Sequence, residues 1–301
     1  MILITEFMHP AGLAYLTSSY DGEVVYAPEI LAEPASLAKL LPQCRGLVVR
    51  NKTQVNASLL EEAMLLQVVG RLGVGLDNID QESLRQKGIQ LIVPKGANAQ
   101  AVAEYVIGGM LDLIRRYRVL DADVRRGAWD RTQGGTELHG KSIGILGYGA
   151  IGRSVAHLAL AFGMTVKVYD PWVESVSAGI EQVQELAQAI DAHFVSLHLP
   201  STPDTKGIAN RAFFTKMPKG SFLINTSRGD LVNESDLAAA VHEGHLAGAL
   251  LDVREQEPPA PLDPFLGLLS VLTTPHVAGL TAEAQKRIGL EVAKGVLTAL
   301  T

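Results

Sequence analysis

Three segments in the second half of the chain each place a reactive side chain shortly after an apolar run: Arg228, Glu257 and His276. A guanidinium offers a planar fork of donors that holds a carboxylate and polarises an adjacent carbonyl. A histidine exchanges protons with a hydroxyl or an oxyanion near neutral pH. A carboxylate beside it would stabilise the charged ring and hold its direction, and the prolines after Glu257 limit that residue's backbone freedom. A surface arginine and a structural histidine are the alternative interpretations.

A glycine pattern earlier in the chain predicts a dinucleotide site. The apolar run 143–146 leads into Gly147-x-Gly149-x-x-Gly152, and a small-residue helical pattern follows. In such a unit the glycines allow a tight turn, close approach of a pyrophosphate, and helix–strand packing. Asp170 ends the next strand, where its carboxylate can accept hydrogen bonds from a ribose 2′-hydroxyl and would repel a 2′-phosphate. The pattern favours NAD over NADP; a glycine-rich turn in another α/β protein is the alternative.

The elements that must position these residues alternate between short apolar runs and helical patterns. This alternation predicts parallel sheets with crossover helices. We expect strands at 1–4, 46–50, 66–70, 89–93, 143–146, 165–169, 192–199, 221–225, 245–252 and 271–273. We expect helices at 9–18, 36–41, 57–63, 81–87 and 154–162, and longer ones at 98–117 and 281–300.

The rhythm restarts at residue 143, so the expected fold is α/β with two Rossmann-like or flavodoxin-like parallel-sheet domains and a cleft between them. Residues 1–97 plus 281–301 would form the substrate-binding domain. Residues 98–280 would form the NAD-binding Rossmann domain. The last helix would return to pack on the first domain.

Composition excludes several classes of protein. The 301 residues are 47% hydrophobic and 19% charged, as in a globular protein, and the net charge of −6 argues against a nucleic-acid-binding surface. The single cysteine, Cys44, precludes an internal disulfide and is expected to be a core residue. No apolar run is long enough to span a membrane, and the first residues lack a leader pattern. We expect a cytoplasmic protein without membrane or nucleic-acid partners and without a metal site.

The order of these motifs resembles the D-isomer-specific 2-hydroxyacid dehydrogenases over most of the chain. The resemblance rests on GYGAIG at 147–152 with Asp170, NTSRG at 225–229, Glu257-Pro, and TPHVAG at 274–279. It extends to VVGRLGVGLDNID at 68–80, GANAQAVAE at 96–104 and GAWDR at 127–131. Within the family, VRNKT at 49–53 is similar to the D-3-phosphoglycerate dehydrogenase branch.

The resemblance assigns His276 the role of general acid/base, Glu257 that of its orienting partner, and Arg228 that of substrate anchor. A hydride would move between C2 of a 2-hydroxy acid and C4 of the nicotinamide. The implied cofactor contacts are Gly147, Tyr148, Gly149, Ala150, Ile151, Gly152, Asp170, Leu199, Pro200, Thr205, Thr226, Ser227, Asp252, His276 and Gly279. The implied substrate contacts are Arg50, Asn51, Val74, Gly75, Asn98, Arg228 and His276.

The substrate itself stays open. Arg228 and Arg50, with Lys52 and Arg71 as further candidates, indicate a dianionic acid such as 3-phosphoglycerate; sulfolactate and glyoxylate or hydroxypyruvate are the alternatives. Surface or interface charge is the other interpretation of Lys52 and Arg71. The branch commonly has serine where this chain has Asn51, which leaves the substrate's identity in question.

The resemblance also leaves assembly and regulation to be tested. A homodimer is expected through the helix at 98–117, whose small face (Ala101, Gly108, Gly109) has internal packing as its alternative role. We expect a short form without the C-terminal regulatory domain of longer relatives. An NAD(H)-sensing corepressor of the same fold is the rival class of function. Formate dehydrogenase is disfavoured, since it usually has glutamine where this chain has Glu257.

Overall fold

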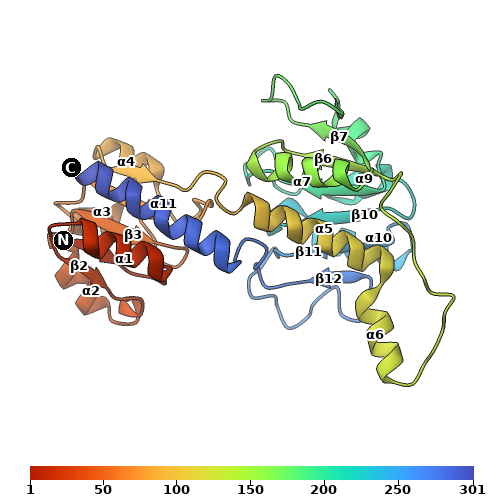
Figure 1. Cartoon of the computed structure of the whole chain (residues 1–301), viewed down its shortest axis with the longest axis horizontal. Helices are drawn as coiled ribbons and strands as arrows, with labels where there is room; N and C mark the ends of the chain where they lie inside the picture. The colour runs from red at the N-terminus through yellow and green to blue at the C-terminus, as the bar shows by residue number, and fades with distance from the viewer. The chain divides into compact units, whose positions relative to one another are not determined.

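Two parallel sheets organise the chain in the computed structural model, which describes residues 1–301 (Figure 1). The first unit comprises residues Met1–Asn98 and Leu280–Thr301, and the second unit comprises Ala99–Gly279. The first contains a five-stranded sheet and the second a seven-stranded sheet. The predicted class, two parallel-sheet α/β domains, is confirmed; the division of substrate and cofactor binding between them stays a prediction.

The first unit has strand order β2-β1-β3-β4-β5, with every pair parallel. Its strands are β1 (Ile2–Ile4), β2 (Val24–Tyr26), β3 (Gly46–Val49), β4 (Val68–Arg71) and β5 (Gln90–Ile92). Its α-helices are α1 (Pro10–Ser19), α2 (Pro34–Leu40), α3 (Ala57–Glu62), α4 (Gln81–Gln86) and α11 (Ala282–Leu300), with 3₁₀ turns η1 (Ile30–Ala32) and η2 (Leu41–Gln43). The edge strand β2 was not expected from the sequence.

Side chains alternate between the two faces of this sheet, and both faces are buried. Ile2 and Ile4 point to the face covered by α1 and α11, where they pack with Val292. Leu3 points to the other face and packs with side chains of α3 and α4. The last helix therefore returns to the first unit, as predicted, and packs along α1 (Figure 1).

The second unit has strand order β12-β11-β10-β9-β6-β7-β8, again all parallel. Its strands are β6 (Ser142–Leu146), β7 (Thr165–Tyr169), β8 (Ile180–Gln182), β9 (Phe194–Leu197), β10 (Phe222–Asn225), β11 (Gly248–Leu251) and β12 (Val271–Thr273). Its helices are α5 (Ala99–Arg115), α6 (Tyr117–Arg125), α7 (Ala150–Ala161), α8 (Leu186–Ile190), α9 (Arg211–Lys216) and α10 (Glu234–His242), with the 3₁₀ turn η3 (Gly229–Leu231). The edge strand β8 was not expected.

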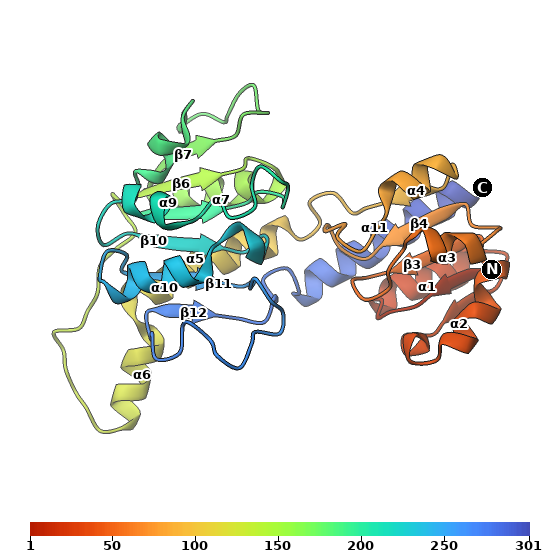
Figure 2. The same cartoon turned by 180° about the vertical axis from the view of Figure 1, so that it is seen from behind.

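Helices cover both faces of this sheet. In Figure 1 α5 and α7 lie in front of the strands, and in Figure 2 α9 and α10 lie on the opposite face. Two hydrophobic clusters match these faces, one containing Val106 and Val155 and the other Phe214 and Leu237. None of the helices is long and apolar enough to cross a lipid bilayer.

The expected helix over 98–117 is wrong at its carboxyl end. Helix α5 stops at Arg115, and Arg116 adopts a left-handed backbone conformation with φ of 56°. The chain then restarts as α6, which extends away from the sheet (Figure 1). Apolar residues continue at helical spacing through this break, so periodicity alone could not reveal it.

Candidate functional site

The carboxyl ends of the second unit's strands gather most of the predicted site residues. Gly147 follows β6, Asp170 follows β7, Thr226 follows β10 and Asp252 follows β11. His276 comes three residues after β12. Parallel strands end at the same sheet edge, where ligands of open α/β sheets bind.

The glycine loop has the geometry that a pyrophosphate requires. A Cβ on Gly152 would lie 2.1 Å from the Gly147 carbonyl oxygen, whereas a Cβ on Gly149 would meet nothing within 4 Å. Helix α7 starts at Ala150 without a side-chain cap, so the first N–H groups, including that of Ile151, stay available for an anion. Gly147 has φ of 95°, which only glycine adopts readily. These residues fit a bound NAD pyrophosphate.

Asp170 is tied to the same loop. Its Oδ2 accepts a hydrogen bond of 2.7 Å from the Tyr148 N–H, and its Oδ1 accepts one of 3.0 Å from the Trp172 N–H. The Tyr148 ring is buried, and its hydroxyl donates to Ser177. Each carboxylate oxygen retains a lone pair for a ribose hydroxyl.

The turn after β10 places Arg228. Buried Asn225 accepts hydrogen bonds from the N–H and hydroxyl of Ser227, and donates from Nδ2 to the Arg228 carbonyl at 2.7 Å. A Cβ on Gly229 would lie 1.8 Å from the Arg254 carbonyl oxygen, so this turn packs on the segment that leads to Glu257. The Thr226 hydroxyl is buried without a hydrogen-bond partner, as expected of a group that awaits a ligand.

Asp252 is buried and holds the His276 loop. Its Oδ1 accepts from the Thr274 hydroxyl (2.7 Å) and the Val277 N–H (2.9 Å), and its Oδ2 accepts from the Ala278 N–H (2.8 Å). The His276 N–H donates to the Asp252 carbonyl at 2.7 Å. His276 has φ of 56°, a costly conformation for a residue with a side chain, which these bonds maintain.

Glu257 and His276 meet side chain to side chain. His276 Nδ1 lies 2.9 Å from Glu257 Oε2, and the other carboxylate oxygen, Oε1, accepts from the Arg254 N–H at 3.1 Å. Both side chains are about half exposed, so solvent or a substrate can reach the ring. The structure therefore brings together two of the three predicted catalytic groups and places Arg228 on the same sheet edge.

Four further cofactor candidates lie around this edge. The Leu199 side chain lies close to Gly147, 3.3 Å from where a Cβ would be. The Thr205 hydroxyl donates to the Pro200 carbonyl at 2.6 Å and accepts from the Thr202 N–H, so it closes its own turn. Gly279 is the last residue of the second unit.

In the first unit, Glu6 holds the loop that carries Arg50. The buried Glu6 carboxylate accepts four backbone hydrogen bonds, from the N–H groups of residues 50–53, at distances between 2.8 and 3.1 Å. Burial raises the pKa of Glu6, but the hydrogen bonds from Thr53, Lys52 and Arg50 outweigh it, so the pKa lies below its ordinary value. The N–H groups of this loop are thus already occupied, so its donors for a ligand are the side chains of partly exposed Arg50 and of exposed Asn51 and Lys52.

A second loop of the first unit, at residues 72–78, lies against the first. Asn78 Nδ2 donates to the Arg50 carbonyl (3.2 Å) and to the Thr53 carbonyl (2.7 Å). The N–H groups of Val74 and Gly75 make no hydrogen bond within the protein, so they remain available as donors. The Arg71 side chain lies over Gly73: a Cβ on Gly73 would be 1.8 Å from Arg71 Nη1.

Asn98, the last residue of the first unit before α5, has a buried side-chain oxygen without a hydrogen-bond partner. Glu6, Asn78 and Asn225 were not expected to support the site. Asn225 is the last residue of β10, Asn78 lies in the loop after β4, and Glu6 follows β1. The position of Glu6 after the apolar run 2–4 was a usable signal. The partners that these residues hold are backbone groups, which leave no trace in residue type.

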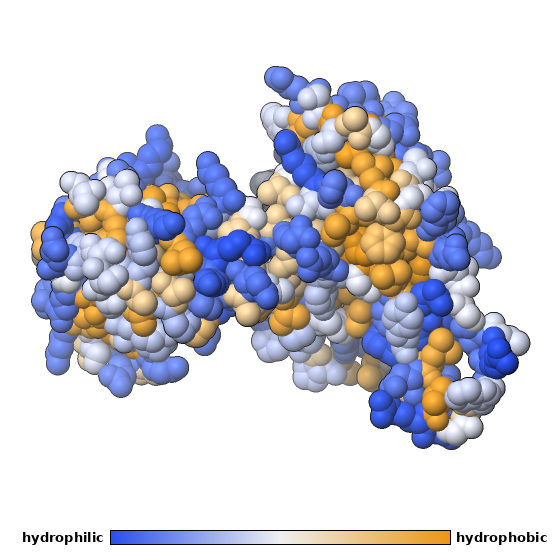
Figure 3. All heavy atoms as spheres, in the orientation of Figure 1, coloured by the Kyte–Doolittle hydropathy of each residue, from blue (hydrophilic) through white to orange (hydrophobic).

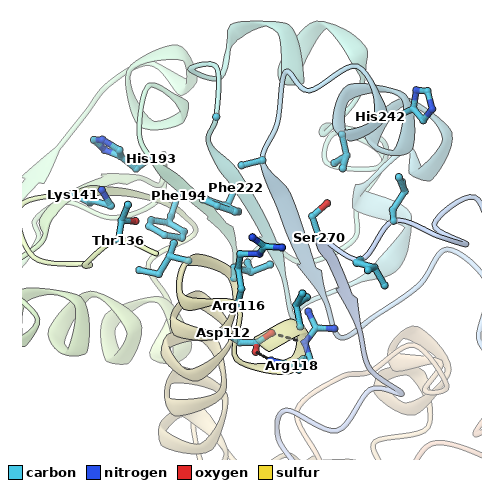
Figure 4. Close-up of a pocket in the computed structure, with 18 of the residues that line it drawn as sticks. Asp112, Arg116, Arg118, Thr136, Lys141, His193, Phe194, Phe222, His242 and Ser270 are labelled. Atoms are coloured by element: carbon cyan, nitrogen blue, oxygen red, sulfur yellow. Dashed lines mark hydrogen bonds and ion pairs between the residues drawn. The ribbon is translucent and has the colours of Figure 1, made fainter. Parts of the chain in front are cut away.

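A separate pocket of about 790 Å³ lies at the other edge of the second unit's sheet (Figure 4). Its lining includes Phe194 and Phe222, the first residues of β9 and β10, and Lys141, which directly precedes β6. At its rim Arg118 pairs with Asp112 at 2.5 Å. Its position separates it from the candidate catalytic residues.

Comparisons with known proteins agree with this geometry. The family model "D-isomer specific 2-hydroxyacid dehydrogenase, NAD binding domain" matches residues 107–278. Over 98% of its length the chain is 38% identical to a D-3-phosphoglycerate dehydrogenase of Methanocaldococcus jannaschii, of which it spans only 56%. It is 38% identical to a hydroxypyruvate reductase of Thermotoga maritima over 89% of each chain.

It is also 38% identical to an (S)-sulfolactate dehydrogenase of Chromohalobacter salexigens, covering 99% of this chain and 98% of that one. Among solved structures, the TT0316 protein of Thermus thermophilus superposes with a TM-score of 0.89 at 30% identity, over 99% of this chain and 96% of that chain. The matched model covers more than half of the chain, and its NAD-binding domain coincides with the glycine loop, Asp170 and the His276 loop. The chain therefore belongs to the D-isomer specific 2-hydroxyacid dehydrogenase family.

Proposed function

We propose that the protein is an NAD-dependent dehydrogenase that interconverts a small 2-hydroxy acid and its 2-oxo acid. The observation that carries this proposal is the 2.9 Å contact between Glu257 Oε2 and His276 Nδ1. It lies on the sheet edge that also bears the glycine loop and Arg228. NAD, when bound, supplies the hydride acceptor or donor at its nicotinamide ring.

His276 handles the proton. An ionised carboxylate accepts hydrogen bonds only, so Glu257 selects the ring form that carries a proton on Nδ1 and leaves Nε2 for the substrate. In the oxidative direction neutral Nε2 takes the proton of the C2 hydroxyl as the C2 hydride leaves. In the reductive direction the charged ring returns that proton to the oxygen that forms at C2.

Arg228 binds the substrate carboxylate and the C2 oxygen in this proposal. A guanidinium holds both with parallel hydrogen bonds, and it stabilises negative charge on the oxygen as the carbonyl is reduced. The N–H groups of Val74 and Gly75 would donate to the same carboxylate, and Asn98 would offer an amide to the substrate. NAD is preferred over NADP because the Asp170 carboxylate repels a 2′-phosphate.

The proposed substrate is a dianion whose second anionic group meets Arg50. This assignment is supported by Glu6, which occupies all four N–H groups of residues 50–53 and leaves charge on the loop's side chains to bind an anion. Asn51 and exposed Lys52 are the neighbouring polar side chains. A phosphate or a sulfonate at C3 would both fit this arrangement.

The test is NADH oxidation by the purified protein with phosphohydroxypyruvate, sulfopyruvate, hydroxypyruvate, glyoxylate and pyruvate, with NADPH in parallel. A preference for one dianion with NADH would support the reaction, the Asp170 assignment and the second anion site together. A preference for hydroxypyruvate or glyoxylate would retain the dehydrogenase and remove the dianion. NADH binding without turnover of any of these acids would favour the rival function, an NAD(H)-sensing binding protein.

We further propose that two copies of the chain form a homodimer. Part of the small face of α5 is packed internally: Ala101 is buried and a Cβ on Gly109 would lie 2.4 Å from Leu250, whereas Gly108 is exposed. The segment that follows exposes Tyr117, Val124 and Trp129. Figure 3 shows an apolar stripe along this projecting segment with hydrophilic side chains beside it, as expected of a surface that another chain covers.

Light scattering at micromolar concentration tests this assembly. Twice the chain mass of 32.2 kDa is expected. A Val124→Asp/Trp129→Asp variant is expected to run as a monomer, and a monomeric wild-type protein would contradict the proposal.

A cytoplasmic location also belongs to the proposal. The buried thiol of Cys44, whose pKa burial raises to about 11, behaves as a core group rather than as a nucleophile.

A further inference from the structure

Arg254 is a buried cation beside the candidate catalytic pair. Its side chain is 6% exposed and lies between two carboxylates. Its Nε and Nη2 each donate to Glu234 at 2.8 Å, and its Nη1 and Nη2 donate to Asp263 at 3.2 and 2.9 Å. The hydrogen bonds to Glu234 raise its pKa despite burial, and those to Asp263 raise it further, so the guanidinium stays charged.

These bonds fix both ends of the segment that carries Glu257. Glu234 lies in the first turn of α10 and also accepts the Glu255 N–H at 2.8 Å. Asp263 also accepts the Phe265 N–H at 3.0 Å, and the guanidinium lies over the Phe265 ring. The loop from 254 to 265 is therefore fastened to α10 and to itself through one side chain.

The backbone of Arg254 links this ion network to Glu257 and to the turn that carries Arg228. Its N–H donates to Glu257 Oε1 at 3.1 Å, while Glu257 Oε2 contacts His276. Its carbonyl packs on Gly229, directly after Arg228. One residue thus touches the Glu257 carboxylate and the turn that bears the proposed substrate anchor.

We propose that Arg254 is a positioning residue that sets the direction of Glu257, and through it of the His276 ring. The inference rests on the proposed function for its kinetic meaning. Its guanidinium donates to Glu234 and Asp263 rather than to His276, so in this proposal it acts through the loop and not by contact with the substrate or the cofactor. A buried ion network adds little stability over well-packed apolar residues, so a role in fixing one loop conformation accounts better for this costly group.

The experiment uses a variant that removes the whole network, because Arg254→Met alone would leave two partly buried carboxylates, Glu234 and Asp263, without their cation. The triple variant Arg254→Met/Glu234→Gln/Asp263→Asn leaves no uncompensated charge. Arg211→Met is the matched control, since Arg211 is an exposed arginine with one distant partner, Glu243, at 3.9 Å. All variants are measured for kcat, KM, NADH affinity by fluorescence, and melting temperature.

We expect the triple variant to bind NADH as the wild type does and to lose roughly 10- to 100-fold in kcat, the scale of a catalytic group misplaced by about an ångström. The same substitutions are then made in a Glu257→Gln background. If Arg254 acts through Glu257, they cause no further loss there. An equal loss in both backgrounds, or an unchanged kcat in the first, overturns the proposal.

Hydrogen–deuterium exchange separates this inference from the proposed function. The N–H groups of Arg254 and Glu255 are expected to exchange faster in the triple variant, whereas those of Val277 and Ala278, held by Asp252, are unchanged. This readout does not depend on turnover. Unchanged exchange at Arg254 and Glu255 overturns the positioning role, whereas a wild type without turnover contradicts only the proposed reaction.

Discussion

Asp252 holds three consecutive N–H groups that begin at His276, although the Asp252 and His276 side chains make no hydrogen bond with each other. The Asp252 carbonyl accepts the His276 N–H at 2.7 Å, and its carboxylate accepts the next two N–H groups, of Val277 and Ala278. These hydrogen bonds to one buried acid offset the cost of the left-handed backbone at His276. The proposed general acid/base owes its direction to Asp252 as well as to Glu257.

Replacing Asp252 by asparagine should therefore lower both stability and activity. Asparagine keeps one acceptor oxygen and turns an N–H₂ toward a backbone N–H, so at least one charge-assisted bond is lost. We expect the free energy of unfolding to fall by about 1.5 to 3 kcal/mol. Denaturant unfolding and kcat measure the two effects. Exposed Asp191→Asn is the control, and wild-type stability in Asp252→Asn would refute the role.

Removal of the Arg50 side chain should weaken binding of a dianionic substrate. Arg50→Ala is expected to lower kcat/KM for the best dianion by roughly tenfold or more, since a charge-assisted pair contributes about 1.5 to 3 kcal/mol. The value for glyoxylate, which has no second anion, should change little. Lys87→Ala, which removes an exposed cation of the same unit outside this loop, is the control. Full kcat/KM for the dianion in Arg50→Ala would remove the second anion site.

Glu6→Gln should disturb the same loop without touching the substrate. A glutamine amide presents two donors to N–H groups of residues 50–53 that the carboxylate now accepts. We expect KM for the substrate to rise severalfold while NADH affinity stays at the wild-type value. Glu23→Gln, at an exposed glutamate between α1 and β2, is the control. A rise in the dissociation constant of NADH alone would show that Glu6 acts elsewhere.

The free energy of unfolding should decrease as pH falls, because the folded protein resists protonation of His198. Burial lowers the pKa of this histidine from 6.5 to about 4, and its Nε2 lies 2.9 Å from the Ser196 hydroxyl. The unfolded chain therefore binds a proton at a higher pH than the folded protein does. The stabilisation is complete above pH 6.5 and is lost as pH falls toward 4.

Melting temperatures between pH 7 and pH 4 measure this contribution. His198→Asn should have a shallower pH dependence over that range, and exposed His242→Asn should follow the wild type. A slope in His198→Asn as steep as that of the wild type would assign the acid sensitivity to other groups, Glu6 among them.

The sequence predicted the glycine loop, Asp170 and the two parallel-sheet units because each depends on local pattern. Glycine spacing fixes a turn, and the carboxyl ends of parallel strands share an edge. The edge strands β2 and β8 were missed because each has only three residues, none of them buried, and β8 (Ile-Glu-Gln) forms no apolar run. The end of α5 was misplaced because Arg116 turns the chain without a glycine or proline.

The supports of the site were not predictable in the same way. Glu6 binds four backbone groups more than forty positions away, and Arg254 joins Glu234 and Asp263 across separate segments. Such contacts depend on the folded sheet rather than on spacing along the chain. The place of Asp252 beside the cofactor stays a prediction, and the hydrogen bonds from its carboxylate to the His276 loop were not expected from the sequence.

The most direct measurement of the proposed reaction follows the hydride itself. NADH carrying deuterium at the transferred C4 position is incubated with the preferred 2-oxo acid, and the hydroxy acid product is examined by mass spectrometry and NMR. One deuterium at C2 for each NADH consumed, in the D-isomer, is the expected result, and a His276→Gln variant should slow its appearance by roughly 10²- to 10⁴-fold. Product without deuterium at C2, or NADH bound with no transfer to any acid, would contradict the account.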